Sequence, residues 1–159
     1  MCGIAGILKI NMSSEVKAID IKKMCDKLSH RGPDGEGYWI SEQKNIGLGH
    51  RRLSIIDLSN DANQPMSIDN DKYIITFNGE IYNHEQLRNS LEKKGCSFKT
   101  DHSDTEVLIN GYKYWGINEL LERIEGDYAF SIWDSIEDKL VIARDRVGVK
   151  PIYFYNDRD

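Results

Sequence analysis

The sequence lacks a disulfide framework, a hydrophobic run long enough to span a membrane, and a strong excess of either charge. Its three cysteines, Cys2, Cys25 and Cys96, lack C-x-x-C spacing, which argues against a disulfide scaffold or a zinc site and favours the reducing cytoplasm. The apolar stretches are only a few residues long, whereas a membrane-spanning helix needs about 20 residues, so no membrane association is predicted. No basic region precedes the first apolar stretch, so a signal peptide is not predicted either.

The charge balance argues against nucleic acid as a partner. The chain of 159 residues carries 21 Lys and Arg against 26 Asp and Glu, a net charge of −5. The basic residues occur in short pairs rather than in a patch that neutralises a phosphate backbone. With 40% apolar residues and no repeat or linker, the chain is long enough for one soluble globular domain with a buried core.

Hydrophobic periodicity and turn residues predict strands and helices that do not strictly alternate. Strands are expected at residues 2–10, 37–41, 46–56, 73–77, 127–133, 140–144 and 152–155. Helices are expected after a cap at Ser13 or Ser14, after Asn83, after the capping box of Ser103 and Glu106, and from Asn118 to Ile124. Several hairpins combined with helices predict an α+β fold with mostly antiparallel sheets.

Cys2 is the candidate nucleophile. Removal of Met1 places a free α-amine on the same residue as the thiol, and an α-amine has an ordinary pKa of about 7.7–8.0. Such an amine can accept the thiol proton and later return it to a leaving group, so that no side-chain base is needed. The alternative interpretation is that Cys2 is a small buried residue of the first strand.

Asn78 and Gly79 are the candidate oxyanion hole. An Asn-Gly pair by itself is typical of a turn. The pair also combines a side-chain amide donor with a backbone N–H that no Cβ obstructs, and such donors stabilise a developing oxyanion. It directly follows an expected strand and continues through residues 80–84 in a pattern that no turn requires.

Seven segments, distributed over essentially the whole chain, stand in the order found in glutamine-hydrolysing asparagine synthetases. They are residues 1–6, 30–34, 52–57, 78–84, 103–107, 126–130 and 144–151. The chain resembles the N-terminal glutaminase domain of that family, a class II glutamine amidotransferase of the N-terminal-nucleophile type. The resemblance implies a four-layer αββα sandwich, in which two antiparallel sheets lie between helical layers.

The resemblance also implies a role for each residue of the site. Cys2 corresponds to the nucleophile that forms a thioester with glutamine, and Asn78 and Gly79 correspond to the oxyanion hole. Arg52 corresponds to the residue that binds the glutamine α-carboxylate, a task that suits the forked guanidinium group. Asp104 corresponds to the carboxylate that receives the α-ammonium group. The other residues that the resemblance places around the substrate are Glu80, Leu53, Ile55 and Ile56.

Structural interpretations stay open for several of these residues. Arg52 would otherwise form a surface ion pair, and Asp104 would otherwise compensate the dipole at a helix N-terminus. His30 is expected to support the pocket. The other three histidines are expected to have structural or solvated roles, because no histidine pair has close metal-ligand spacing. No metal site is predicted.

The activity that the resemblance implies is hydrolysis of L-glutamine to L-glutamate and ammonia. In complete family members the ammonia reaches a C-terminal domain that uses ATP and Mg²⁺ to convert aspartate to asparagine. The Ser-Gly-Gly-x-Asp-Ser pyrophosphate-binding segment of that domain does not occur in this sequence. We therefore expect residues 1–159 to be a glutaminase domain, truncated at its C-terminus, without a cofactor of its own and with the synthetase domain as an absent partner. A homodimer is also compatible with the sequence.

Two other functions stay open from the sequence. The first is the glutaminase half of another amidotransferase, which supplies ammonia to a sugar or purine precursor, although residues 30–34 and 78–84 favour the asparagine-synthetase branch. The second is a non-catalytic module that keeps the fold, and a retained Met1 would create one by acylating the α-amine. The joint presence of nucleophile, oxyanion donors and substrate anchors argues against the second alternative.

Overall fold

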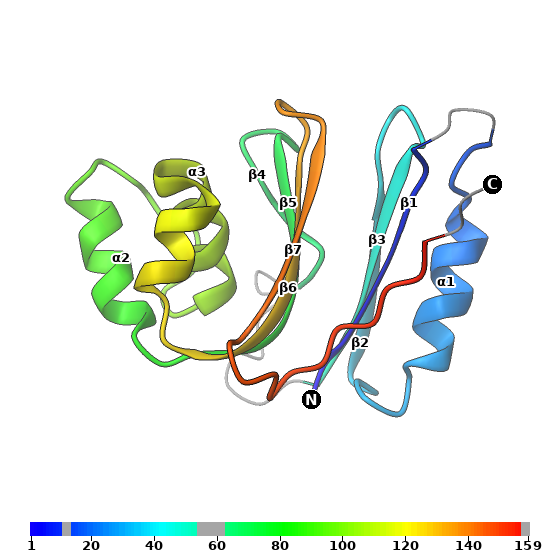
Figure 1. Ribbon diagram of the computed structural model, residues 1–159, viewed down its shortest axis with the longest axis horizontal. Helices are drawn as coiled ribbons and strands as arrows, with labels where there is room; N and C mark the ends of the chain where they lie inside the picture. Colours follow the sequence, from blue (N-terminus) through cyan, green and yellow to red (C-terminus); the bar gives the residue numbers. More distant parts are fainter. Residues whose placement is uncertain (11–13, 54–62, 157–159) are drawn as a thin grey trace.

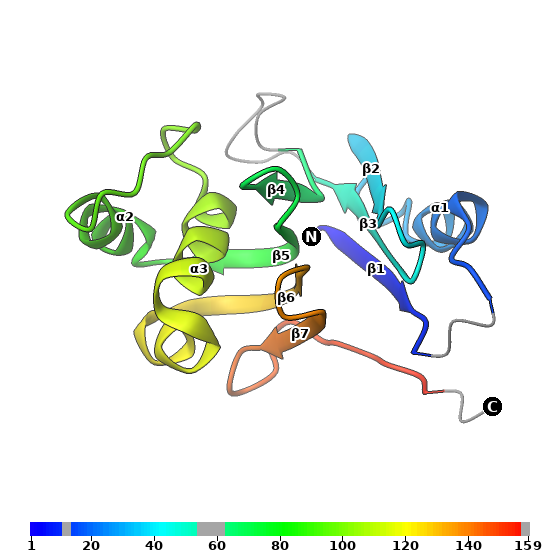
Figure 2. The same ribbon diagram turned by 90° about the horizontal axis from the view of Figure 1, so that it is seen from above.

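The chain folds into two antiparallel sheets that pack face to face between helices (Figures 1 and 2). The computed structural model describes residues 1–10, 14–53 and 63–156. Its elements are β1 (Gly3–Leu8), α1 (Ala18–Lys27), β2 (Gly35–Ile40), β3 (Ile46–Arg52), β4 (Met66–Ile68), β5 (Tyr73–Ile81), α2 (His84–Glu92), α3 (Asp104–Arg123), β6 (Gly126–Asp134) and β7 (Lys139–Arg144).

The layers follow the order that the sequence resemblance implies. The first sheet has the strand order β1-β3-β2 and the second sheet has the order β4-β5-β6-β7, with every pair antiparallel. In both views α1 covers the outer face of the first sheet, and α2 and α3 cover the outer face of the second sheet. The expected α+β class and the αββα order are therefore confirmed.

Three hydrophobic clusters hold the four layers together. The cluster between the sheets consists of Ile46, Leu48, Ile74 and Trp133. A second cluster joins α1 to the first sheet, and the largest cluster fills the space between the second sheet and α2 and α3. Burial of one such side chain stabilises the fold by about 1.5–3 kcal/mol, so these clusters hold each layer against the next.

The alternation of side chains along a strand shows which residues face the space between the sheets. In β3 the even-numbered Ile46 and Leu48 face the second sheet, and in β5 the even-numbered Ile74 faces the first sheet. The odd-numbered Ile75 and Phe77 of β5 instead pack against α2 and α3. Even-numbered positions of β3 and β5 therefore point into the space between the sheets.

α3 contains both helices that were expected between residues 103 and 124. Ser103 Oγ accepts the Glu106 N–H at 3.3 Å, which confirms the expected N-cap. The Glu106 carboxylate does not complete a capping box but accepts N–H groups of Lys99 and Thr100 at 2.7 and 2.8 Å. Gly116, with φ of 72°, interrupts the helical conformation, which is why the sequence pattern predicts two separate helices.

Other expected elements are wrong or shifted. α1 begins at Ala18 rather than after Ser14, because the Val16 N–H donates to Lys44 O at 2.7 Å and the Val16 side chain is buried outside the helix. The alternative cap Ser13 lies outside the described residues. The short strand β4 was not expected from the sequence.

The segment after β7 does not form the expected strand at residues 152–155. Tyr153, Phe154 and Tyr155 are 91%, 83% and 87% exposed. A strand needs a neighbouring strand to satisfy its backbone groups, and sequence alternation alone does not supply one. Within the described ranges, no helix combines the length and the apolar character needed to cross a membrane.

Candidate active site

Cys2 lies immediately before β1, and its thiol contacts the residue that follows β3. Cys2 Sγ accepts a hydrogen bond from the Leu53 N–H at 3.4 Å and lies 3.8 Å from Leu53 O. Arg31 Nε donates to Cys2 O at 3.1 Å. Ala5 and Ile7 of β1 pack toward α1, so the alternation places Cys2 on the opposite face, toward the second sheet. The half-buried thiol is thereby held at the end of β3.

The two adjacent arginines at the end of β3 face opposite directions. Arg51 faces α1, and its Nη2 lies 3.0 Å from a carboxylate oxygen of Asp26 on α1 and 3.0 Å from one of Glu36 on β2. Arg52 occupies an even-numbered position and faces the second sheet, and its Nη1 donates to Asn63 Oδ1 at 2.8 Å. Of the pair, only Arg52 is directed toward the face on which Cys2 lies.

Asn78 and Gly79 lie within β5 and not in a turn after it. They pair with Ala129 and Tyr128 of β6, which continues alongside β5 to its end. The interpretation of the Asn-Gly pair as a turn is therefore wrong, as is the expected end of this strand at residue 77. Asn78 occupies an even-numbered position and is 5% exposed, so its side chain points into the space between the sheets.

The N–H of Gly79 points out of the edge of β5 that faces away from β6. In an antiparallel strand the N–H and C=O of one residue share a side, and the side alternates from residue to residue. The N–H groups of Phe77 and Ile81 both point away from β6, to Gln64 Oε1 at 2.6 Å and to Asp104 Oδ2 at 3.1 Å. Gly79 lies between these two residues in the same register, so its N–H points to the same edge.

Tyr128, which lies opposite Gly79 on β6, indicates the same direction for the Gly79 N–H and explains why glycine is required at position 79. Both backbone groups of Tyr128 bond to Asp145, its N–H at 3.3 Å and its C=O at 2.8 Å, so they face away from Gly79. The two residues thus form a non-hydrogen-bonded pair, in which the backbones approach closely. A Cβ on Gly79 would lie 2.2 Å from Asp127 O and 2.7 Å from Tyr128 Cα, so alanine does not fit without a backbone shift.

Asp145 holds Tyr128 in place from the far side of β6. Its side chain is buried, and its carboxylate accepts the N–H groups of Tyr128, Val149 and Lys150 at 3.3, 2.8 and 2.9 Å. Burial alone raises the pKa of Asp145, but these donors and the Gly148 N–H outweigh it and hold the pKa below its ordinary value of 3.8. The loop after β7 is therefore folded around one ionised carboxylate.

We expect Asp145→Asn to lower the free energy of unfolding by about 1–3 kcal/mol, because an amide nitrogen would face backbone donors that need an acceptor. Urea denaturation followed by circular dichroism measures this loss. The matched control is Asp138→Asn, an exposed residue of the β6–β7 turn, which should stay within about 0.5 kcal/mol of wild type.

The effect of Asp145→Asn should also depend on pH. Because the pKa of Asp145 is depressed in the folded chain, its stabilising contribution is present above the unfolded value of 3.8. The contribution is lost as the pH falls through the lower folded value, so the difference between wild type and variant should shrink in acid. A difference of constant size from pH 7 down to the acid transition contradicts this assignment.

Asp104 is the first residue of α3, and its carboxylate faces the end of β5. Its Oδ2 accepts the Ile81 N–H, two residues beyond Gly79. Burial raises the pKa of the Asp104 carboxyl, and the Ile81 N–H opposes this effect. The carboxylate also lies in the first turn of α3, where a negative charge stabilises the helix, so its structural role coexists with a place beside the candidate oxyanion donors.

The structure brings most of the predicted residues to one end of the sandwich. β3 and β5 run in the same direction and end at the edge where the N-terminus also lies, between the two sheets (Figure 1). Cys2, Arg52 and Asn78 all face the space between the sheets at this end. The N–H of Gly79 points out of β5 near the same end. A thiol, a guanidinium group and two amide donors are therefore directed into one region.

The remaining predicted residues are Leu53, Glu80, Ile55, Ile56 and His30. Leu53 contacts Cys2 through its backbone, and Glu80 is exposed near the end of β5. Ile55 and Ile56 lie outside the described residues. His30 is exposed, so the support that the loop of residues 30–34 gives to Cys2 comes through Arg31. Among the described residues, no group of three or more His, Cys, Asp or Glu side chains is arranged to hold a metal ion.

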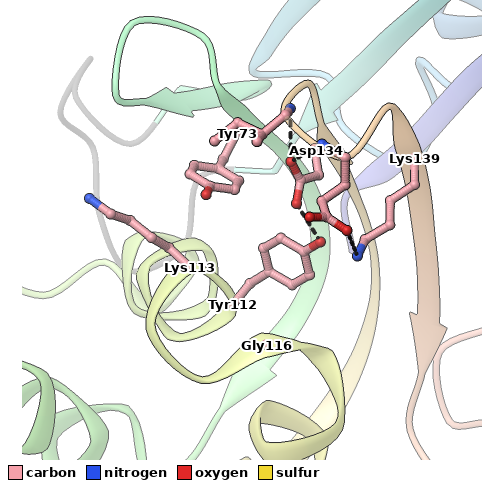
Figure 3. Close-up of a pocket in the computed structure, with 8 residues that line it drawn as sticks. Tyr73, Tyr112, Lys113, Gly116, Asp134 and Lys139 are labelled. Atoms are coloured by element: carbon pink, nitrogen blue, oxygen red, sulfur yellow. Dashed lines mark hydrogen bonds and ion pairs between the residues drawn. The ribbon is translucent and has the colours of Figure 1, made fainter.

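A hollow of about 260 Å³ lies at the opposite end of the second sheet, where β5 begins and β6 ends (Figure 3). Within it the Tyr112 hydroxyl donates to Asp134 Oδ2 at 2.8 Å, and Asp134 Oδ1 accepts two N–H groups of the β6–β7 turn. Lys139 Nζ lies 3.4 Å from a Glu137 carboxylate oxygen. These polar groups bond to one another and close the β6–β7 hairpin, and the hollow is lined by none of the described site residues.

Known proteins resemble this chain over its whole length. A family model described as "Glutamine amidotransferase domain" matches residues 1–159. Asparagine synthetase (glutamine-hydrolyzing) 1 of Bacillus subtilis is 42% identical over 161 residues, which cover 100% of this chain and 25% of that protein. Putative asparagine synthetase (glutamine-hydrolyzing) 2 of Methanocaldococcus jannaschii is 41% identical over 173 residues, which cover 99% of this chain and 32% of that protein.

A solved structure shares the fold. Glutamine phosphoribosylpyrophosphate amidotransferase from B. subtilis, complexed with ADP and GMP, superposes with a TM-score of 0.67. The two chains are 24% identical, and the match covers 89% of this chain and 37% of that chain. The chain spans only about a fifth to a third of the length of the curated relatives it matches.

Proposed function

The chain belongs to the glutamine amidotransferase family, and from this premise we propose that it hydrolyses L-glutamine to L-glutamate and ammonia. The observation that carries the proposal is the common orientation of Cys2, Arg52 and Asn78 into the space between the sheets, beside the N–H of Gly79. A nucleophile, a carboxylate-binding cation and two oxyanion donors are the parts that hydrolysis of an amino-acid amide requires. The free thiol suits the reducing cytoplasm.

Acylation begins with attack of Cys2 Sγ on the side-chain amide carbon of glutamine. The α-amine, freed by removal of Met1, accepts the thiol proton, since its ordinary pKa of about 7.7–8.0 matches the pH of the cytoplasm. As the S–C bond forms, the amide oxygen becomes an oxyanion that the Asn78 side chain and the Gly79 N–H stabilise. The protonated amine then gives its proton to the leaving nitrogen, so that ammonia departs and a thioester remains.

Deacylation uses the same groups in the reverse order. Water transfers a proton to the α-amine as its oxygen attacks the thioester carbon, and Asn78 and Gly79 stabilise the second oxyanion. Collapse of this intermediate breaks the C–S bond, returns the proton to Cys2 and releases glutamate. The Leu53 N–H, which donates to Cys2 Sγ at 3.4 Å, stabilises the thiolate as it leaves.

Two charged side chains orient the substrate. Arg52 faces the same space as Cys2, and its guanidinium group can bind both oxygens of the glutamine α-carboxylate. Asp104 lies beside the end of β5, where its carboxylate can accept the α-ammonium group. This pairing of opposite charges selects a free amino acid over a peptide, in which both charges are lost.

In a longer protein, the ammonia would serve asparagine synthesis. This proposal rests on sequence identity of 41–42% to two proteins named as glutamine-hydrolysing asparagine synthetases, against 24% to the phosphoribosylpyrophosphate amidotransferase. The partner would then be a synthetase domain that uses ATP and Mg²⁺ to activate aspartate. The glutaminase reaction itself is the same whether the ammonia serves asparagine synthesis or another amidotransferase product.

Incubation of the purified chain with L-glutamine tests the proposed reaction. We expect glutamate and ammonia in equal amounts, with no release from L-asparagine, which has one methylene group fewer. Mass spectrometry of the same sample determines whether Met1 has been removed. Failure of a folded, Met1-free chain to release ammonia from glutamine overturns the proposed function, and turnover by a chain that retains Met1 overturns the role of the α-amine as base.

Substitution of Asp104 by asparagine is expected to raise the KM for glutamine about 10- to 100-fold, because the α-ammonium group loses its ionised acceptor. The amide oxygen of the introduced asparagine can still accept the Ile81 N–H, so kcat and folding should change little. In wild type, the raised pKa of Asp104 means that this residue is protonated early as the pH falls. As the pH falls, the KM of wild type should therefore begin to rise at a higher pH than a carboxyl with the ordinary pKa of 3.8 would cause.

The matched control for Asp104→Asn is Asp101→Asn, an exposed carboxylate just before α3. We expect this control to keep the wild-type KM and its dependence on pH. Steady-state assays from pH 5 to pH 8 measure both quantities. An unchanged KM in the Asp104 variant would rule out its contact with the substrate.

A further inference from the structure

His50 forms a buried hydrogen bond between the two sheets. It lies on β3 of the first sheet, is 1% exposed, and its Nε2 lies 3.2 Å from Phe77 O on β5 of the second sheet. A carbonyl oxygen can only accept a hydrogen bond, so Nε2 carries the proton. Burial lowers the pKa of His50 to about 4, and therefore the ring is a neutral donor at the pH of the cytoplasm.

On the edge of β5 that faces away from β6, the backbone groups of Phe77 are held by side chains rather than by a strand. β4 pairs with β5 only as far as the Met66–Ile75 pair, so the edge of β5 beyond that point has no neighbouring strand among the described residues. Phe77 N–H donates to Gln64 Oε1 at 2.6 Å, and Phe77 O accepts from His50. The backbone groups that point out of this edge immediately before the candidate oxyanion hole are thus both held.

The same strand that carries His50 also holds the nucleophile. Leu53 directly follows β3, and its N–H donates to Cys2 Sγ at 3.4 Å. His50 is only three residues earlier and holds the residue that precedes Asn78. A short, regular piece of β3 therefore connects the support of the thiol to the support of the oxyanion donors, across two different sheets.

We propose that His50 is a positioning residue, which sets the placement of the Asn78 amide and the Gly79 N–H relative to Cys2. This inference rests on the proposed glutaminase function. Oxyanion donors act only when they lie about 2.7–3.1 Å from the developing negative charge, and a displacement of about 1 Å costs on the order of 100-fold in rate. Without the His50 donor, Phe77 O is unpaired in a buried place and β5 shifts at the position that must stay fixed.

The test compares His50→Leu, which has no donor, with His50→Gln, whose amide N–H can still reach Phe77 O. For glutamine hydrolysis we expect kcat to fall about 10- to 100-fold in His50→Leu, with KM within about twofold of wild type. His50→Gln should recover most of the lost kcat. His102→Gln, a change of an exposed histidine, is the matched control and should leave kcat unchanged.

A second measurement separates positioning from a general loosening of the fold. Alkylation of Cys2 by iodoacetamide forms an S–C bond and releases iodide without producing an oxyanion, so its rate reports the thiol but not Asn78 or Gly79. We expect His50→Leu to keep the alkylation rate of wild type while its kcat falls. Mass spectrometry confirms that Cys2 is the alkylated residue.

The possible results differ clearly. If wild type hydrolyses glutamine and His50→Leu has an unchanged kcat, this inference is overturned but the proposed function stands. It is also overturned if alkylation and thermal stability fall in parallel with kcat and His50→Gln recovers none of them, because His50 would then serve only the fold. If folded wild type itself shows no turnover of glutamine, the proposed function fails and this inference fails with it.

Discussion

Replacement of Cys2 by alanine is expected to lower the rate of glutamine hydrolysis by at least about 10³-fold. The change removes the sulfur that forms the thioester, and among the described side chains no other nucleophile is hydrogen-bonded to Leu53 at the end of β3. Cys2→Ser should retain only a trace of activity, because a hydroxyl is far less ionised than a thiol near neutral pH. An assay of ammonia release with each purified variant measures the effect.

Cys96→Ala is the matched control for Cys2→Ala. Cys96 is buried against the helices on the outer face of the second sheet, away from the space that Cys2 faces. We expect this control to lose some stability but to keep kcat within about twofold of wild type once it is folded. Substantial hydrolysis by Cys2→Ala would show that another group attacks the substrate.

Asn78→Ala is expected to lower kcat about 10²- to 10³-fold while KM changes little, because the side-chain amide stabilises the oxyanion and not the ground state. The Asn78 side chain is 5% exposed and points into the space between the sheets, where water does not easily replace it. Steady-state kinetics with glutamine separate the two parameters.

The control for Asn78→Ala is Asn89→Ala on the exposed face of α2. This control should match wild type in both kcat and KM. A rise in KM with an unchanged kcat for Asn78→Ala would assign this residue to substrate binding rather than to the oxyanion. Circular dichroism of both variants establishes that neither effect reflects loss of the fold.

Much of the fold follows from local signals in the sequence. The hairpin of β6 and β7 and the helix capped by Ser103 were predictable, because apolar period and cap residues act within a few positions. The order of the layers came instead from the family resemblance. The direction of Arg52 relative to Arg51 follows from the period of a strand, once the buried face of β3 is known.

The environment of Asn78 and Gly79 was not predictable in the same way. Locally this pair favours a turn, but β6 pairs with it and Asp145 holds Tyr128 of β6 from the other side. These partners lie about 50 to 70 residues further along the chain. Tertiary pairing overrides the local propensity, and no pattern near residue 78 reveals it.

The bond between His50 and Phe77 was hidden for a related reason. The two residues are 27 positions apart and belong to different sheets, so neither shows a signal for the other in the sequence. The only hint was a histidine that follows Ile46 and Leu48 at the next even-numbered position of the expected strand. Conversely, the apolar residues at 152–155 predicted a strand that is not formed, because the described part of the structure gives it no neighbour.

The position of Cys2 directly before β1 has a practical consequence for work with this protein. Gly3, the first residue of β1, already pairs with Arg51 of β3, so no unpaired residue separates Cys2 from the sheet. Any affinity tag, fluorescent reporter or vector-derived residue placed ahead of Cys2 must emerge from between the two sheets. Fusions that leave Cys2 unobstructed should therefore be attached on the C-terminal side of β7, where Tyr153 and Phe154 are exposed to solvent.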